Sequence, residues 1–296
     1  MSKTHYLALS RISGVGGATA RKLIDRFGTL ARAFDADEHE MLSIPRVTPE
    51  IVRSMREFEP DSLESELDAL DGEGIGVLTW EDDDYPANLQ SAPDAPVMLY
   101  VVGDILPDDE RAIAIVGTRE PSGPAVEQAE SMAARLASKG FTIVSGLAPG
   151  IDTAAHRGAL RADAGRTLAV LGSGVRMIHP RENVELAREI AGRGAVISEY
   201  HPNTPVKGPQ LMARDRIVSG LSLAVIVVEA GSMSGSVDTA EKARRQGRKV
   251  FAVPGSPGCD ELIASGARSL DPGDLDALIA GASAESDEPQ EQLGLW

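Results

Sequence analysis

The sequence has very little cysteine: one residue, Cys259, in 296. A single cysteine cannot form a disulfide within the chain, and no cysteine–histidine cluster has the spacing of a structural zinc site. No apolar run reaches the roughly 20 residues of a membrane-spanning helix, and no signal-peptide pattern opens the sequence. These absences predict a cytoplasmic protein with no metal site and no membrane partner.

Basic residues are outnumbered by acidic ones, 29 against 45, and the formal net charge is therefore −16. The average conceals four blocks. Residues 1–34 carry a net charge of +5, residues 35–110 carry −19, residues 111–270 carry +5 and residues 271–296 carry −7. Segregated charge is more informative than the total. Basic side chains bind phosphates, and salt weakens that binding steeply. Basic blocks that are kept within a chain this acidic therefore indicate a polyanionic ligand.

The first 70 residues read as a small helical domain. A helix is followed by Gly14-Val15-Gly16 and a second helix, which is the helix-hairpin-helix (SAM-like) pattern. Residues 41–58 read as a degenerate second copy. In this pattern the backbone N–H groups that open the second helix can approach a phosphate. The alternative is a plain helical hairpin that packs on a neighbour, and the sequence leaves both open.

The rest of the chain predicts an α/β fold, a Rossmann-like doubly wound and mostly parallel sheet. Near-continuous apolar strands alternate with amphipathic helices, as in parallel sheets covered on both faces. We expect domains at 1–70, 71–270 and an acidic, disordered tail at 271–296. The expected strands are 75–80, 97–103, 112–117, 141–146, 167–172, 195–200, 223–230 and 249–255, and the expected helices after residue 120 are 123–140, 151–162, 181–194, 208–220 and 236–247.

Glycine and polar residues follow several of these strands. Ligands of doubly wound sheets bind beyond the carboxyl ends of the strands, where backbone amides form nests for phosphate oxygens. Each residue also has a simpler interpretation: the glycines can serve only the turns, and the arginines can pair with Glu199 or Asp215. Their convergence at one sheet edge favours a phosphate site. The candidates are Gly117, Thr118, Arg119, Ser145, Gly146, Gly150, Lys207, Arg214, Arg216, Gly235 and Ser236.

Familiar nucleotide-binding and catalytic motifs are missing. The segments GTREPSGPA and GSGVRM do not match the dinucleotide fingerprint, and no G-x-x-x-x-G-K-[ST] loop is present. Neither a G-x-S-x-G elbow nor an ordered Ser-His-Asp set stands out. Phosphate cradles without a catalytic constellation predict binding rather than catalysis, with no cofactor.

A longer set of motifs resembles DNA-processing protein A, the DprA/Smf family. The resemblance rests on AIVGTRE, GFTIVSGLAPGIDTAAHRGAL, TLAVLGSGV, HPRENVEL, ISEYHPNTP, RDRIVSGLS, VVEAGSMSGSVDTAEKARRQGRKVFAVPG and ELIASGA, in order over roughly residues 5–270. It implies a homodimer that binds and protects single-stranded DNA. It also implies loading of a RecA-type recombinase during DNA uptake, natural transformation or recombination, without turnover.

The resemblance also implies where the DNA lies. By motif, contacts are expected at Gly117-Thr118-Arg119, at the loop of Ser145, Gly146, Leu147 and Ala148, and at Arg214-Asp215-Arg216. Asp215 departs from the family, which usually has Asn there. Two further departures are a shortened loop after residue 253 and an acidic end too short for the winged-helix domain of many members.

Aromatic side chains make up only 4% of the chain, so little base stacking is expected. The nearest candidates are Tyr200 and His201, and Tyr200 can equally belong to the core.

Two further hypotheses concern an enzyme and the tail. The alternative function is that of a nucleotide-binding phosphoribohydrolase-like enzyme of a related Rossmann-like fold. The comparable segment, EAGSMSGSVDTAE, lacks the P-G-G-x-G-T-x-x-E motif of those enzymes.

In the tail, Gln290, Leu293 and Trp296 resemble the short peptide that docks on sliding clamps, although its usual second aromatic is missing. A chance match, or a tail that folds back on its own domain, is the competing interpretation.

Overall fold

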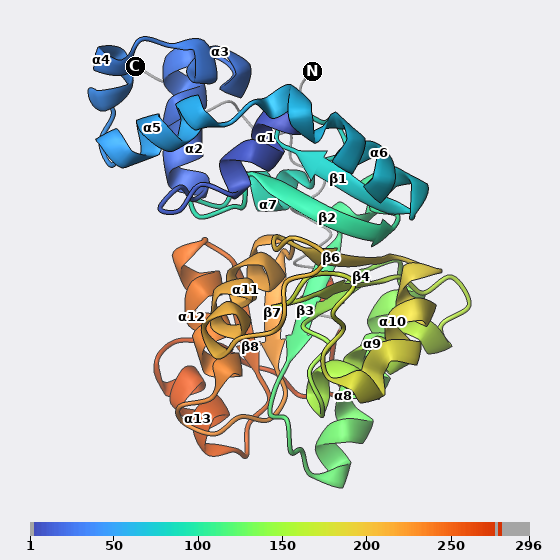
Figure 1. Ribbon diagram of the computed structural model, residues 1–296. Helices are drawn as coiled ribbons and strands as arrows, with labels where there is room; N and C mark the ends of the chain where they lie inside the picture. Colours follow the sequence, from blue (N-terminus) through green and yellow to red (C-terminus); the bar gives the residue numbers. More distant parts are fainter. Residues whose placement is uncertain (1–2, 276–277, 280–296) are drawn as a thin grey trace.

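The computed structural model describes residues 3–275 and 278–279. Its centre is a nine-stranded sheet in the order β1-β2-β6-β5-β4-β3-β7-β8-β9 (Figure 1). The pairs β1–β2 and β2–β6 are antiparallel, and every other pair is parallel. The strands are β1 Ile75–Thr79, β2 Met98–Gly103, β3 Ala112–Val116, β4 Thr142–Ser145, β5 Thr167–Val170, β6 Ala195–Ser198, β7 Ala224–Val227, β8 Lys249–Ala252 and β9 Arg268–Ser269.

Helices cover both faces of this sheet, which confirms the predicted doubly wound architecture. Helices α8 and α9 pack on one face through Met132 and Ile151, while α11 and α12 pack on the other through Ile217 and Ala240. Beyond residue 80 the helices are α7 Ala87–Gln90, η2 Pro107–Glu110, α8 Gly123–Ser138, α9 Ile151–Arg161, η3 Arg181–Asn183, α10 Val184–Ala191, α11 Gly208–Gly220, α12 Gly235–Arg245 and α13 Pro257–Ala264.

The centre of the sheet has a topological switch point. The chain runs from β3 through α8 to β4 on one side, whereas β7, the other neighbour of β3, is followed by α12 on the opposite face. Because the two helices leave for opposite faces, a crevice opens beyond the carboxyl ends of β3 and β7. The fold therefore places its ligand crevice where the sequence gathers its glycine-rich strand ends.

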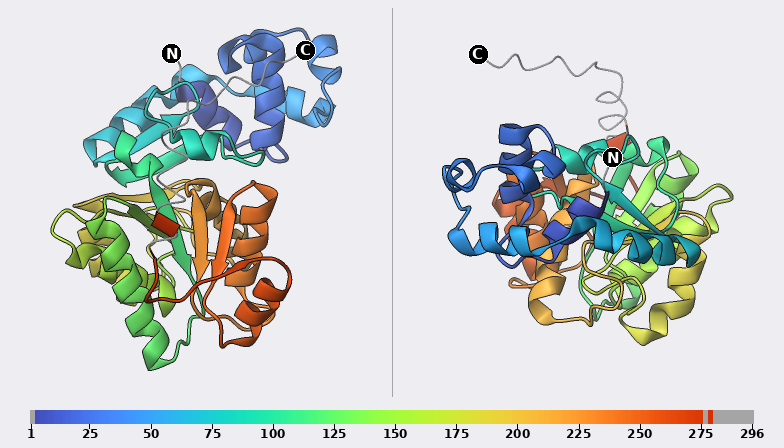
Figure 2. Two further views of the ribbon diagram at one scale, coloured as in Figure 1. Left: turned by 180° about the vertical axis from the view of Figure 1, so that it is seen from behind. Right: turned by 45° about the horizontal axis from the view of Figure 1, so that its top comes forward.

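The N-terminal helices gather beyond β1 and β2 (Figures 1 and 2). Their apolar side chains form one continuous core with the neighbouring part of the sheet, from Tyr6 to Val196. The predicted domain boundary between residues 70 and 71 therefore stays a prediction. These elements are α1 Lys3–Ser10, α2 Gly17–Phe27, α3 Leu30–Asp35, α4 Glu38–Leu42, α5 Pro49–Glu57, η1 Pro60–Leu63 and α6 Glu64–Gly72.

The glycine turn between α1 and α2 packs against its neighbours. A Cβ atom on Gly17, the first residue of α2, would overlap the carbonyl oxygen of Ala95. A Cβ on Gly14 would lie 3.9 Å from the side chain of Ile51 in α5. The contact at Gly17 favours the packing interpretation for the start of α2, whereas a Cβ on the exposed Gly16 would meet nothing within 4 Å.

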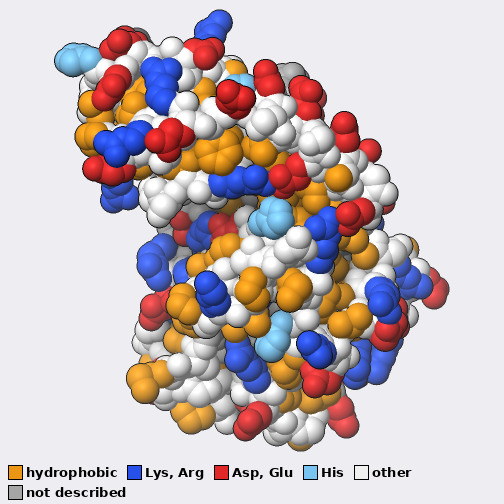
Figure 3. Space-filling view, in the orientation of Figure 1, with side chains coloured by type: hydrophobic (Ala, Val, Ile, Leu, Met, Phe, Trp, Pro, Cys, Tyr) orange, Lys and Arg blue, Asp and Glu red, His pale blue; other side chains and the backbone are white. Residues whose placement is uncertain are grey.

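Three of the six basic side chains of residues 1–34 form ion pairs with acidic neighbours. Lys3 pairs with Asp82 at 3.1 Å, and Arg26 pairs with Glu40 at 3.3 Å. Acidic side chains also follow one another along the edge formed by η1 and α6 (Figure 3). The N-terminal region is therefore a poor surface for a polyanion.

Two elements near the C-terminal end were not predicted. Helix α13 and the two-residue edge strand β9 lie in a segment that the sequence presents as loop. Leu275 and Leu278 are buried in the core with Phe251, so the packed core continues past residue 270. The proposed clamp motif, Gln290, Leu293 and Trp296, lies outside the described residues. Across the described residues, no helix combines the length and apolar character needed to span a membrane.

Candidate functional site

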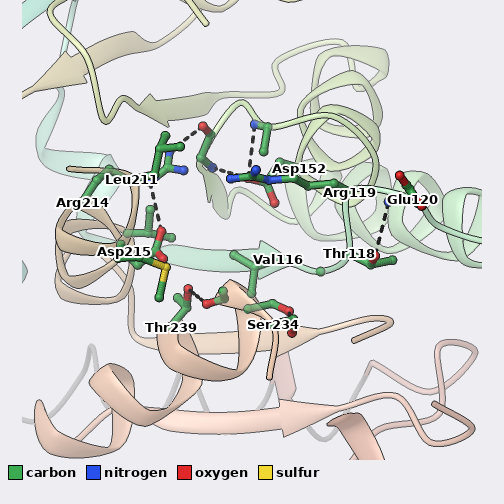
Figure 4. A pocket seen from close by; sticks show the side chains of 17 residues that line it. Val116, Thr118, Arg119, Glu120, Asp152, Leu211, Arg214, Asp215, Ser234 and Thr239 are labelled. Carbon is green, nitrogen blue, oxygen red and sulfur yellow. Dashed lines mark hydrogen bonds and ion pairs between the residues drawn. The ribbon is translucent and has the colours of Figure 1, made fainter. Parts of the chain in front are cut away.

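A pocket of about 440 Å³ occupies the crevice at the switch point (Figure 4). The loops after β3 and β4, the middle of α11 and the first turn of α12 form its walls. Nine of the predicted site residues line it: Gly117, Thr118, Arg119, Gly146, Ala148, Arg214, Asp215, Gly235 and Ser236. The other lining residues are Val116, Glu120, Asp152, Leu211, Met212, Val218, Ser234 and Thr239.

The first turn of α12 supplies free backbone donors to the pocket. Ser234 precedes the helix as its N-cap but does not cap it through its side chain. The N–H groups of Gly235 and Ser236 have no hydrogen-bond partner in the described part of the chain. Free N–H groups and the helix dipole together favour a bound anion at such a terminus.

Arg119 is the free cation of the site. It is exposed, follows β3, and forms no hydrogen bond or ion pair through its side chain with the described residues. A guanidinium that is not committed to a carboxylate can bind a phosphate in bidentate fashion. Arg119 and the first turn of α12 therefore border one pocket with unused donors.

The loop after β4, by contrast, already holds an anion of its own. The N–H groups of Gly146 and Ala148 donate to Oδ2 of Asp152, at 3.1 and 3.3 Å. Asp152 lies in the first turn of α9, where a carboxylate is favoured by the helix dipole. The carboxylate thus occupies the position that the sequence suggested for a phosphate.

Three other predicted residues of this region do not line the pocket. Ser145 is buried and donates through Oγ to the carbonyl of Ile115 at 2.7 Å. Leu147 has a φ of 59° and places its side chain in the core. Gly150 has a φ of 82°, and a Cβ there would overlap the carbonyl oxygen of Thr118. Their role is to shape the loop.

In the wall of the pocket, two buried carboxylates lie near one arginine. The guanidinium of Arg214 donates to Oδ1 of Asp215 at 3.0 Å and to the carbonyl oxygens of Gly146 and Val170. Burial raises the pKa of Asp215 to about 6; Arg214 opposes this shift and Asp152 reinforces it. Burial also raises the pKa of Asp152, against the attraction of Arg214. With both acids ionised, the three side chains carry one net negative charge.

The remaining predicted cations lie outside the pocket. Arg216 forms a bidentate ion pair with Glu199, at 2.7 and 2.6 Å, and donates to the carbonyl of Asp94. Lys207 is exposed and precedes α11. The pairing of Arg216 with Glu199 is the simpler interpretation that the sequence left open, and the structure shows it.

The predicted stacking residues lie elsewhere as well. Tyr200 and His201 border a separate hollow with Tyr100, and Nε2 of His201 lies 3.3 Å from Glu66. Burial raises the pKa of Tyr200 to about 12. Met212 and Thr239, which do line the main pocket, had no signal in the sequence, because only the packing of α11 against α12 brings them to it.

Fold and pocket together define a class: Rossmann-like α/β proteins with a crevice at the switch point of the sheet. The family model described as DNA recombination-mediator protein A matches residues 76–278, and a model described as a SAM-like helix-hairpin-helix tandem matches residues 6–58. The chain belongs to the DNA recombination-mediator protein A family, as the motif resemblance predicted.

Relatives of known name agree with this assignment. Protein Smf of Synechocystis is 34% identical over 304 residues, covering 98% of this chain and 75% of the relative. DNA processing protein DprA of Bacillus subtilis is 40% identical over 211 residues, covering 69% of this chain and 71% of the relative. Both names belong to the DprA/Smf family.

Solved structures agree with the fold. DprA from Streptococcus pneumoniae superposes with a TM-score of 0.76 at 31% identity, covering 94% of this chain and 98% of that one. DprA from Helicobacter pylori superposes with a TM-score of 0.62 at 29% identity, covering 71% and 97%. That structure describes the single-stranded DNA binding mode of the H. pylori protein.

Proposed function

We propose that this chain binds single-stranded DNA, with a phosphodiester held between Arg119 and the first turn of α12. One observation carries the proposal: a free guanidinium and two unused N–H groups, of Gly235 and Ser236, border the same pocket. The single-stranded DNA bound by the H. pylori relative supports it. Gly117, Thr118 and Ala148 complete the wall beside the strand.

A single strand suits this pocket better than a duplex. The donors border a crevice, so a bound backbone must bend toward it to bring one phosphate within reach of all of them. A duplex is stiff, with a persistence length of about 50 nm, and bending a short site costs several kcal/mol. A flexible strand avoids that cost.

The partners and outcome of binding are part of the same proposal. The protein acts as a homodimer, protects the strand and loads a RecA-type recombinase onto it, as the motif resemblance implies. The name of the family, DNA recombination-mediator protein A, supports the role in recombination. A sliding clamp is a further partner through the tail. A peptide of residues 285–296 tests the clamp contact by calorimetry, with the Trp296→Ala peptide as its control.

Binding without turnover is proposed as well. Nucleoside monophosphates incubated with the protein test the enzymatic alternative, because a phosphoribohydrolase releases free base. Release of base by the wild type, lost in Arg119→Ala, would favour that alternative.

The Arg119→Ala variant tests the site. It should weaken binding to single strands of any sequence and lower the slope of log K against log salt by about one phosphate contact. Arg245→Ala is the matched control, because Arg245 is an exposed arginine at the far end of α12. Equal effects of the two variants would mean that only bulk charge matters, and would reject the site.

A further inference from the structure

Two exposed methionines flank the pocket. Met233 is 99% exposed and Met212 is 43% exposed. In the described chain the exposed large apolar side chains are Leu42, Leu106, Met177, Met212 and Met233. Met212 lines this pocket, and Met233 directly precedes Ser234, which also lines it. Single exposed apolar residues are ordinary, but their grouping at a binding crevice marks an interaction surface.

Met233 is presented by an anchored loop. The loop connects β7 to α12, and it is held on α13: Ser256 Oγ accepts from the N–H of Ala230 at 3.1 Å, and Ser232 Oγ donates to Glu261 at 2.7 Å. At 99% exposure the Met233 side chain makes almost no contact with the folded chain. It is therefore free to contact a bound molecule.

A distance for Met212 and a sequence spacing for Met233 bring the two residues beside the first turn of α12. Met212 lines the pocket, and its sulfur would lie 3.8 Å from a Cβ atom on Gly235. Met233 precedes Gly235 by two residues, which limits their Cα separation to about 7 Å. A nucleotide whose phosphate rests on the N–H groups of Gly235 and Ser236 therefore has its base within reach of both sulfurs.

The chemistry of the pocket calls for such a contact. Sites that hold single strands usually stack bases on aromatic rings, yet no aromatic residue lines this pocket. The thioether of methionine is polarizable, adapts its shape and makes favourable contacts with aromatic faces. It can replace a stacking ring without selecting one base over another.

We propose that Met212 and Met233 form a base-contacting pair that holds the nucleobases beside the phosphate bound at α12. This inference rests on the proposed function, and it adds an apolar contact to a site otherwise built from charge and backbone donors. The pair makes the protein distinguish a strand with bases from a bare sugar-phosphate backbone.

Fluorescence anisotropy with two oligothymidylates of equal length tests the pair, one normal and one with abasic sites in place of its bases. The wild type should bind the normal strand about three- to tenfold more tightly. Met233→Ala should lose most of that preference and keep its affinity for the abasic strand. Met233→Trp should bind the normal strand more tightly than the wild type does.

Met177→Ala is the matched control, since Met177 is also 43% exposed but borders a different groove. It should bind both strands as the wild type does. Unchanged binding by Met233→Ala, or an equal loss on both strands, would overturn the inference and leave the phosphate site standing. Wild-type protein that binds neither strand would refute the proposed function itself.

Discussion

Asp215 is the residue on which the electrostatics of the pocket depend. Its carboxylate lies at the pocket wall, near the first turn of α12, where a Cβ on Gly235 would be 3.9 Å from Oδ2. The charged groups that act on it are Arg214 and Lys242, which attract its negative charge, and Asp152 and Asp238, which repel it. A phosphate bound nearby adds a further repulsion, so DNA binding favours the protonated acid.

The sign of the pH dependence follows from that preference. Burial raises the pKa of Asp215 to about 6, so the acid is ionised at pH 7.5 and protonated at pH 5. Affinity for single-stranded DNA should therefore rise as the pH falls through 6, by about tenfold, or ~1.4 kcal/mol. Anisotropy titrations between pH 5 and 8 at constant ionic strength measure it.

The Asp215→Asn variant distinguishes the titration of Asp215 from that of the histidines. The amide is neutral at every pH, so the variant should bind about tenfold more tightly than the wild type at pH 7.5. Its affinity should then vary little across the range. A variant that keeps the full pH dependence would assign the titration to another group.

The residue scale is also where the sequence was least informative. It found Arg119, Gly235 and Ser236 from their places after strands. It could not show that Asp152 accepts from the N–H groups of Gly146 and Ala148, because that depends on how tightly one loop closes. Nor could it separate Arg214, buried among carbonyl oxygens, from Arg119, which is free.

At the scale of elements, helix α12 is the main contributor of donors. Its first residue, Gly235, is the N1 position, which tolerates proline because its N–H has no partner within the helix. Ser234 has φ −84° and ψ 157°, an extended conformation that a following proline requires. Gly235→Pro should therefore preserve the helix and remove one donor to the phosphate.

Gly235→Ala is the control, because alanine keeps the N–H and meets only the sulfur of Met212 at 3.8 Å and Asp215 at 3.9 Å. The proline variant should bind single strands about tenfold to a hundredfold more weakly than the alanine variant, in line with about 1.5–3 kcal/mol for a charge-assisted hydrogen bond. Equal affinity of the two variants, with unchanged thermal unfolding, would show that this N–H does not touch the DNA.

The regular elements were largely predictable, and physical reasons explain the exceptions. Strands β3 to β8 are short runs of apolar residues bounded by glycine or polar turns, so their pattern indicates buried parallel strands. Helix α13 spans only eight residues and opens with Pro257 and Gly258, which read as loop formers. Pro257 is instead at the helix start, where proline is favoured.

At the scale of the molecule, net charge misrepresents the binding surface. The chain carries −16 overall, yet much of the acidic charge belongs to residues 35–110, at the N-terminal end of the structure. The switch-point pocket lies within residues 111–270, which carry +5. Charge patterning predicted this separation, but not the neutralisation of Lys3 and Arg26 by acidic partners.

The proposed homodimer makes a prediction at the same scale. Light scattering in high salt should report twice the chain mass of 31.2 kDa, since closed pairs are the commonest assemblies of identical chains. The dimer should form in the absence of DNA as well as in its presence. A monomer at micromolar concentration would contradict the proposed dimer but would leave the proposed DNA site unaffected.

The most direct test of the central claim is the affinity of the intact protein for single-stranded and duplex oligonucleotides of the same sequence over a salt series. The account predicts tighter binding of the single strand at every salt concentration. It also predicts a linear fall of log K with log salt, as expected when cationic groups of the protein displace the counterions of the phosphates. Equal or tighter binding of the duplex, or a single strand that is not bound even at low salt, would contradict the account.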